Sequence, residues 1–113
     1  MTFSTAVIGA SGFTGGELLR LISDHPKLEL IQATSRKYSG RSIGYTHPNL
    51  RDLKLKYSSP SEIQSVDVLF LATPHGVSMN QMGDFLTIAK TVVDLSADFR
   101  LRDPKKYDEY YSG

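Results

Sequence analysis

Three glycines near the start of the chain have the spacing of a phosphate-binding turn. Gly9, Gly12 and Gly15 follow an apolar run and precede an amphipathic stretch. Gly9 permits a tight turn, Gly12 has no Cβ and lets a pyrophosphate approach the backbone, and Gly15 lets the next helix pack closely. The N–H groups and dipole of the first helical turn add positive potential. This order predicts a dinucleotide site. A simple Gly-rich turn is the alternative, because the spacing is G-x-x-G-x-x-G rather than G-x-G-x-x-G.

A basic cluster follows the second predicted strand, Leu28–Thr34. Ser35, Arg36 and Lys37 stand where an Asp or Glu would accept hydrogen bonds from the adenosine ribose of NAD. Arg36 can make a paired contact with a phosphate, Lys37 adds a point charge, and Ser35 can donate one hydrogen bond. These groups favour NADP, whose ribose carries a 2′-phosphate, with Arg41 as a further candidate contact. A solvated basic loop is the alternative interpretation.

The turn after the strand predicted over Val68–Ala72 is a second candidate contact with the dinucleotide. Pro74 stiffens this turn, and Gly76 allows close approach at a helix start. These residues and His75 could contact the nicotinamide ribose or the pyrophosphate. His75 could also act as a general acid, but no base or nucleophile is visible beside it, so a structural or hydrogen-bonding role is favoured.

The strand predicted over Thr91–Leu95 ends in further polar residues. Ser96 and the adjacent Ala97 are placed to border the nicotinamide. Asp98 and Arg100 are expected to pair and brace the loop.

The elements that position these groups alternate between strands and helices. The strands are predicted at Ser4–Gly9, Leu28–Thr34, Leu53–Tyr57, Val68–Ala72 and Thr91–Leu95. The helices are predicted at about Gly12–Asp24, from Ser59 to about Ser65, at Val77–Lys90, and after Asp103. Apolar faces are expected at Gly15, Leu18, Leu19 and Ile22 in the first helix and at Met82, Phe85, Leu86 and Ala89 in the third. The class is α/β, a Rossmann-like doubly wound parallel sheet of order 3-2-1-4-5, with the ligand between strands one and four.

Composition excludes several other classes of function. The chain has 113 residues, a formal charge of +1 and no cysteine. We therefore expect one domain at most, without affinity for nucleic acid or membranes, without a secretion signal, and located in the cytoplasm. The motifs above make residues 1–113 an NADP-binding domain, which we expect to be incomplete because a two-lobed enzyme needs a longer chain. A thiol nucleophile is excluded within these residues, and the three histidines have no metal-ligand spacing, so no metal is expected.

Four segments carry a resemblance to a known family. GASGFTGG at 9–16, TSRK at 34–37, LATPHG at 71–76 and VVDLSADFRL at 92–101 resemble N-acetyl-gamma-glutamyl-phosphate reductase and its relative in lysine biosynthesis, whose substrate is attached to an amino-group carrier protein. Thr73 stands where the family often has Leu. The family enzyme is about three times longer and joins a Rossmann-type cofactor domain to an α+β domain.

The resemblance implies roles for particular residues and a reaction. Ser11, Gly12, Phe13 and Thr14 would bind the pyrophosphate, and Ser35, Arg36 and Lys37 the 2′-phosphate. The family's catalytic cysteine and histidine lie beyond residue 113, so His75 is not that histidine and no catalytic residue is expected here. The cysteine attacks an acyl phosphate, phosphate leaves, and NADPH reduces the thioester to an aldehyde. The full-length protein is expected to be a homo-oligomer.

Three other classes remain open. Short-chain reductases share a similar glycine trio but need Tyr-x-x-x-Lys, and none of the six tyrosines has Lys four residues later. A stand-alone dinucleotide-sensing module fits the length and the missing nucleophile but leaves VVDLSADFRL unexplained. An aspartate-semialdehyde dehydrogenase-like reductase is disfavoured by that segment and by LATPHG. A downstream domain with one well-placed cysteine would favour the reductase over the sensor.

Overall fold

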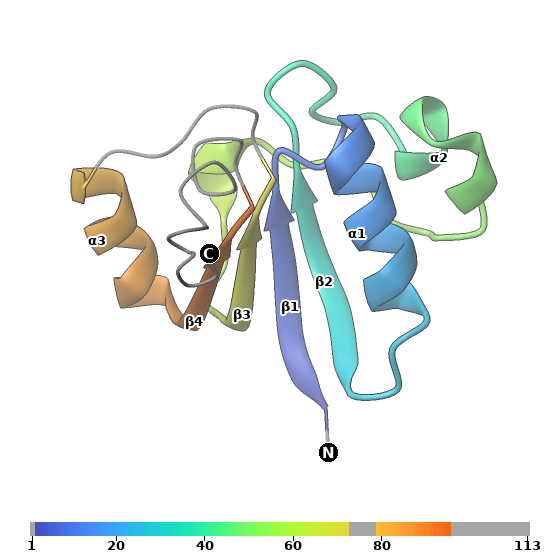
Figure 1. Cartoon of the computed structure of the whole chain (residues 1–113). Coiled ribbons are helices and arrows are strands. Elements are labelled where there is room, and N and C mark those ends of the chain that lie inside the picture. Colours follow the sequence, from blue (N-terminus) through green and yellow to red (C-terminus); the bar gives the residue numbers. More distant parts are fainter. Residues whose placement is uncertain (1, 73–78, 96–113) are drawn as a thin grey trace, which may run out of the picture.

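The sheet is parallel throughout the part of the chain that the computed structural model describes, residues 2–72 and 79–95. Its order is β2-β1-β3-β4 (Figure 1). The bounds are β1 (Phe3–Ile8), β2 (Leu28–Thr34), β3 (Val66–Leu71) and β4 (Ala89–Asp94). The predicted class is confirmed, as is the predicted order of these four strands. The helix predicted after Asp103 lies outside the described residues.

The carboxyl ends of all four strands meet at one edge of the sheet. Ile8 pairs with Thr34 on one side and with Leu71 on the other, and Leu71 pairs with Asp94. The chain therefore leaves every strand at the same edge, where ligands bind in open α/β sheets. The glycine turn follows β1 and the basic cluster follows β2, so the sheet brings these two predicted ligand contacts together.

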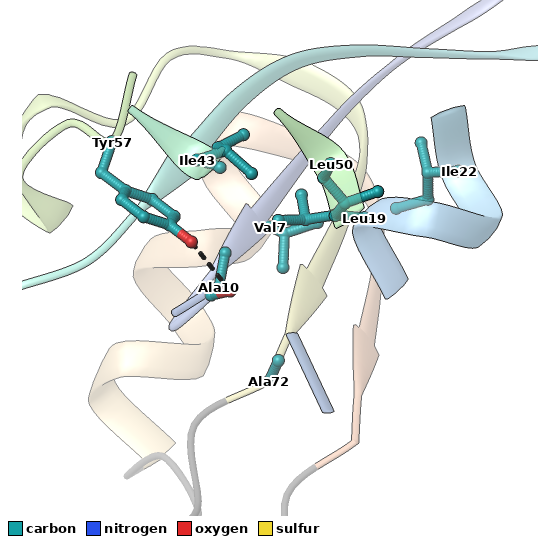
Figure 2. Close-up of a cluster of buried hydrophobic side chains, with 9 residues drawn as sticks. Val7, Ala10, Leu19, Ile22, Ile43, Leu50, Tyr57 and Ala72 are labelled. Carbon is teal, nitrogen blue, oxygen red and sulfur yellow. Dashed lines mark hydrogen bonds between the residues drawn. The ribbon is translucent and has the colours of Figure 1, made fainter. Parts of the chain in front are cut away.

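Helices cover both faces of the sheet. Val7 packs in one apolar cluster with Leu19 and Ile22 of α1 (Phe13–Ser23), as Figure 2 shows. Ala6 and Ile8, which point to the other face, form a second cluster against which α3 (Met79–Ile88) packs. The unbroken apolar run Ala6–Ile8 in β1 suits this double burial.

The predicted helix faces are confirmed in α1 and partly wrong in α3. Gly15, Leu19 and Ile22 are buried, as expected. In α3, Phe85 packs against the second cluster through its apolar ring. Leu86 is 57% exposed, so the prediction that it belongs to the buried stripe is wrong. It lies directly after Phe85, about 100° further round the helix, and so points away from the face that packs. Ala89 already begins β4, and Met82 lies outside the described side chains.

The strand predicted over Leu53–Tyr57 is wrong. The segment forms only isolated bridges, antiparallel between Ser42 and Lys56 and parallel between Thr34 and Ser58. The reason is a competing partner: Tyr57 N donates to Arg41 O at 2.8 Å, and Gly40 N donates to Tyr57 O at 2.7 Å. The backbone of this segment thus pairs with residues 40–43, and its pairing with β2 is limited to the next residue, Ser58, whose N donates to Ala33 O at 3.0 Å.

The segment Ser35–Asp52, between the strands predicted at Leu28–Thr34 and Leu53–Tyr57, contains short helices, α2 (Ile43–Thr46) and η1 (Pro48–Leu50). With their neighbours they fold against the first apolar cluster through Ile43, Leu50 and Tyr57 (Figure 2). The segment from 35 to 58, called here the 35–58 arm, is therefore packed onto the sheet rather than extended into solvent.

The helix predicted from Ser59 is a single 3-10 turn, η2 (Pro60–Glu62), and is shorter than expected. Ser59 caps this turn, because Ser59 N donates to Glu62 Oε1 at 3.0 Å and Ser59 Oγ accepts from Ser61 N at 3.3 Å. Gln32 explains the early end. Its Nε2 donates to Glu62 O at 2.9 Å, and its Oε1 accepts from Gln64 N at 2.8 Å, so a buried amide takes the groups that a longer helix would pair internally.

Candidate functional site

The glycine turn has the local geometry that its sequence predicts. Gly9 has a φ of 77°, a conformation that side chains disfavour. A Cβ on Gly15 would lie 2.5 Å from Ala10 Cα, so only glycine lets α1 approach the turn this closely. A Cβ on Gly12 would meet nothing within 4 Å, which leaves open space above the backbone at that point. Ala10 N donates to Thr34 O at 2.9 Å and ties the turn to the end of β2.

Among the described residues, the backbone donors at the start of α1 have no protein acceptor. Gly12 is the N-cap and supplies no side chain, and the first turn holds no acidic residue. The first helical hydrogen bond runs from Gly16 N to Gly12 O, so the N–H groups of Phe13, Thr14 and Gly15 come before the internal pattern begins. Phe13 is 85% exposed. This donor set, with the open space at Gly12, fits an anionic group such as a pyrophosphate.

Ser35 joins the glycine turn to the basic cluster. Its side chain is buried, and its Oγ donates to Ser11 Oγ at 3.1 Å. The same oxygen accepts from Tyr38 N at 3.1 Å and so shapes the start of the 35–58 arm. The structure thus brings together a residue predicted to contact the pyrophosphate, Ser11, and one predicted to contact the 2′-phosphate, Ser35.

The cations of the arm differ in their surroundings. Lys37 Nζ lies 5.5 Å from the ring centre of Tyr38, and the Arg41 guanidinium lies 4.7 Å from that of Tyr45. Both cations thus have an aromatic partner. Arg36 is exposed and, within residues 2–72 and 79–95, makes no hydrogen bond or ion pair. It is the cation of this group best able to receive an anion.

Sequence reasoning missed a second layer behind the glycine turn. His47 Nε2 lies 2.9 Å from Ala10 O, and the Tyr57 hydroxyl lies 3.4 Å from the same oxygen, as the dashed line in Figure 2 shows. The Tyr57 hydroxyl is also 2.6 Å from Thr46 Oγ1. Burial raises the pKa of Tyr57 above its ordinary value of 10, while the Thr46 hydrogen bond acts in the opposite direction and more weakly. The doubled glycine at 15 and 16 was the available signal, because a Cβ on Gly16 would lie 2.5 Å from the His47 ring.

Four predicted contacts, Pro74, His75, Gly76 and Ser96, lie outside the described residues. The strands that precede them, β3 and β4, end at the edge that carries the glycine turn. In the described part of the chain no three His, Asp or Glu side chains gather as a metal site would require. None of the helices described there has the length and apolar character needed to cross a bilayer.

Comparison with known proteins shows the class. The family described as semialdehyde dehydrogenase, NAD binding domain, matches residues 4–111, and the chain belongs to it. The Rossmann-like fold is also seen in an aspartate semialdehyde dehydrogenase with NADP from Candida albicans, which aligns with a TM-score of 0.56 and 19% identity over 88% of this chain and 31% of that one. The family match supports a nicotinamide dinucleotide as the cofactor class.

The relatives by sequence are phosphate reductases. A protein of Haloarcula marismortui named as a LysW-L-2-aminoadipate/LysW-L-glutamate phosphate reductase is 60% identical over all of this chain and 33% of its own length. An N-acetyl-gamma-glutamyl-phosphate reductase of Methanobrevibacter smithii is 46% identical over 96% of this chain and 32% of its own length. The resemblance noted in the sequence is confirmed. The chain spans about a third of the length of these relatives.

Proposed function

We propose that the chain is the NADP(H)-binding domain of an acyl-phosphate reductase. The observation that carries the proposal is the placement of two anion-binding groups at one sheet edge: the open start of α1, and Arg36 beyond the end of β2. The Ser35–Ser11 hydrogen bond joins their supporting loops. A dinucleotide with a third phosphate has charges suited to both places.

Each predicted contact takes a role in this proposal. Gly9 and Gly15 shape the turn, and the pyrophosphate lies against Ser11, Gly12, Phe13 and Thr14. Arg36 binds the 2′-phosphate, Lys37 adds positive potential, and Ser35 positions the loop. Pro74, His75, Gly76 and Ser96 are assigned to the nicotinamide half, because they follow the two strands on the other side of β1. The bound dinucleotide supplies the hydride, and this domain holds and orients it.

The substrate of the whole protein is proposed from its relatives. Those named above act on N-acetyl-gamma-glutamyl phosphate or on LysW-linked aminoadipate and glutamate phosphates. We propose an acyl phosphate of this type, free or on a carrier protein, and a cysteine nucleophile outside these residues, since the chain has none. A homo-oligomer in the cytoplasm is part of the same proposal.

The cofactor assignment is tested by comparing NADP with NAD in calorimetric titrations of the full-length protein. We expect wild type to bind NADP more tightly. Arg36→Ala should weaken NADP by about 10- to 100-fold, the effect of losing a charge-assisted phosphate contact, and leave NAD within about twofold. Arg41→Ala, whose guanidinium already lies over Tyr45, is the matched control with a smaller effect. Equal losses for the two cofactors in Arg36→Ala would contradict the 2′-phosphate role.

The reaction class is tested by NADPH consumption at 340 nm. The full-length protein should oxidise NADPH with N-acetyl-gamma-glutamyl phosphate or with a carrier-linked aminoadipyl phosphate, and should release one phosphate for each NADPH. Free carboxylic acids lack the leaving group and should give no turnover. Dinucleotide binding without turnover on any acyl phosphate would favour the sensing module instead.

A further inference from the structure

The carbonyl of Ala10, inside the glycine turn, is held by a residue far away in the sequence. His47 lies 37 residues further along, and its Nε2 is 2.9 Å from Ala10 O. A carbonyl oxygen can only accept, so the imidazole must carry its proton on Nε2 and donate it. The Tyr57 hydroxyl, at 3.4 Å, is a second and longer donor to the same oxygen.

The direction of this carbonyl decides where the next backbone donor points. The described residues contain no cis peptide, so the Ala10–Ser11 peptide is trans and planar. In a trans peptide the C=O and N–H bonds point in opposite directions. With the Ala10 carbonyl aimed at His47, the Ser11 N–H points away from His47. Among the described residues that N–H has no hydrogen-bond acceptor.

His47 is also locked in place by the helix it faces. A Cβ on Gly16 would lie 2.5 Å from Cε1 and 2.7 Å from Nδ1 of the ring, so the imidazole occupies the space beside α1 that any other residue at 16 would fill. His47 N donates to Ile43 O at 3.0 Å, which fixes the backbone of the histidine at the end of α2. The ring therefore contacts both the turn and the first helical turn after it.

We propose that His47 is a positioning residue for the dinucleotide: its Nε2–H holds the Ala10 peptide so that the Ser11 N–H is presented to the pyrophosphate. This inference rests on the proposed function. Tyr57 assists from the same side. The pyrophosphate is common to NAD and NADP, so the effect of His47 is the same for both cofactors. In this it differs from Arg36, which acts only on the 2′-phosphate.

The test measures binding of NADP and of NAD to the full-length protein, at a temperature well below the unfolding midpoint of every variant. His47→Leu keeps bulk beside Gly16 but removes the donor. It should raise the Kd of both cofactors by about 10-fold, the loss of one well-formed hydrogen bond. His47→Gln retains an N–H donor at the corresponding distance and should restore binding to within about threefold of wild type. Tyr57→Phe should raise both Kd values by only about two- to threefold, as suits a longer bond.

Two controls and a spectroscopic measurement separate positioning from simple stability. His25→Gln changes a histidine whose Nδ1 accepts from Lys27 N at the opposite edge of the sheet, and it should leave both Kd values unchanged. Tyr45→Phe removes an exposed hydroxyl and keeps the ring beneath Arg41. It should also leave the Kd of both cofactors unchanged. Nitrogen-15 NMR of the imidazoles should show His47 with its proton on Nε2 before and after the cofactor is added.

The outcomes are distinguishable. If wild type binds neither cofactor, the proposed function fails. If wild type binds but His47→Leu binds equally well, the positioning role is wrong. The positioning role is also wrong if His47→Leu and His47→Gln lose the same affinity. A proton on Nδ1 alone would also overturn it. If His47→Leu does not fold, Tyr57→Phe, the failure or success of the glutamine rescue and the NMR measurement still decide the question.

Discussion

At the scale of single residues, two helical glycines differ in the space that surrounds them. Gly15 lies against the backbone of Ala10, where an added Cβ would approach to 2.5 Å. Gly83, in α3, has no heavy atom within 4 Å of such a Cβ. Only the first is required by close packing, and the second merely lowers the stability of its helix.

These surroundings predict opposite effects of the same substitution. Gly15→Ala should lower the free energy of unfolding by about 1–3 kcal/mol, because rigid backbone must move to admit the methyl group. Gly83→Ala should raise it by about 0.5–1 kcal/mol, since alanine is the better helix former. Urea denaturation of the full-length protein measures both. A neutral Gly15→Ala would show that α1 can shift away from the turn without loss.

The roles of Gly9 and Gly15 could be predicted because a turn and a close helix contact demand a particular residue type. The hydrogen bond of His47 could not, because its acceptor is a main-chain oxygen that any residue at position 10 would supply. The sequence named Arg36 as a candidate phosphate contact, together with Lys37 and Arg41. It could not show that Lys37 and Arg41 each lie over an aromatic ring, because that depends on the folded arm.

At the scale of elements, the regular strands and α1 were predictable and the 35–58 arm was not. β2 was predicted to its exact limits from its apolar pattern between Pro26 and a polar cluster. The pattern at Leu53–Tyr57 also suits a strand, but pairing with 40–43 depends on a loop that folds back. Likewise, η2 ends where Gln32, a residue some thirty positions earlier, takes its backbone groups.

The amino ends of β1 and β3 are joined by a carboxylate, which gives a pH-dependent contribution to stability. Asp67 accepts from Ser4 N at 3.0 Å and from Ser4 Oγ at 3.3 Å, and Lys90 Nζ lies 3.7 Å away. The Ser4 backbone hydrogen bond is the main cause that holds the pKa of Asp67 below its usual 3.8, with the Ser4 hydroxyl and Lys90 acting in the same direction against partial burial.

A lowered pKa in the folded state stabilises the fold only while the carboxylate is ionised. Wild type should therefore exceed Asp67→Asn in stability by a constant amount above about pH 5, and the difference should shrink as the pH falls through 3.8 and below. Urea denaturation across pH 2–7 measures this difference. Asp52→Asn is the control, since Asp52 is exposed and makes no hydrogen bond or ion pair in the described part of the chain. A difference that persists at the lowest pH would contradict the electrostatic cause.

At the scale of the whole molecule, the alternation of strands and helices was enough to predict a parallel sheet whose strands all end at one edge. The sheet grows in opposite directions from β1, and the right-handed crossover rule then accounts for α1 and α3 covering opposite faces. The predicted third strand was wrong because its backbone pairs with residues 40–43, and that pairing depends on how the arm folds back in the assembled chain.

The central place of β1 has a consequence for how the protein is made. β1 is synthesised before β3, which lies beside it in the sheet. Ser4 of β1 hydrogen-bonds to Asp67 of β3, 63 residues later. At roughly 5–20 residues per second, about 3–13 seconds pass on the ribosome before that neighbour exists. A parallel strand cannot be shielded meanwhile by a hairpin. During translation Ala6 and Ile8 therefore lack the β3 side of their apolar cluster. In this interval their exposed apolar side chains are a binding site for a chaperone.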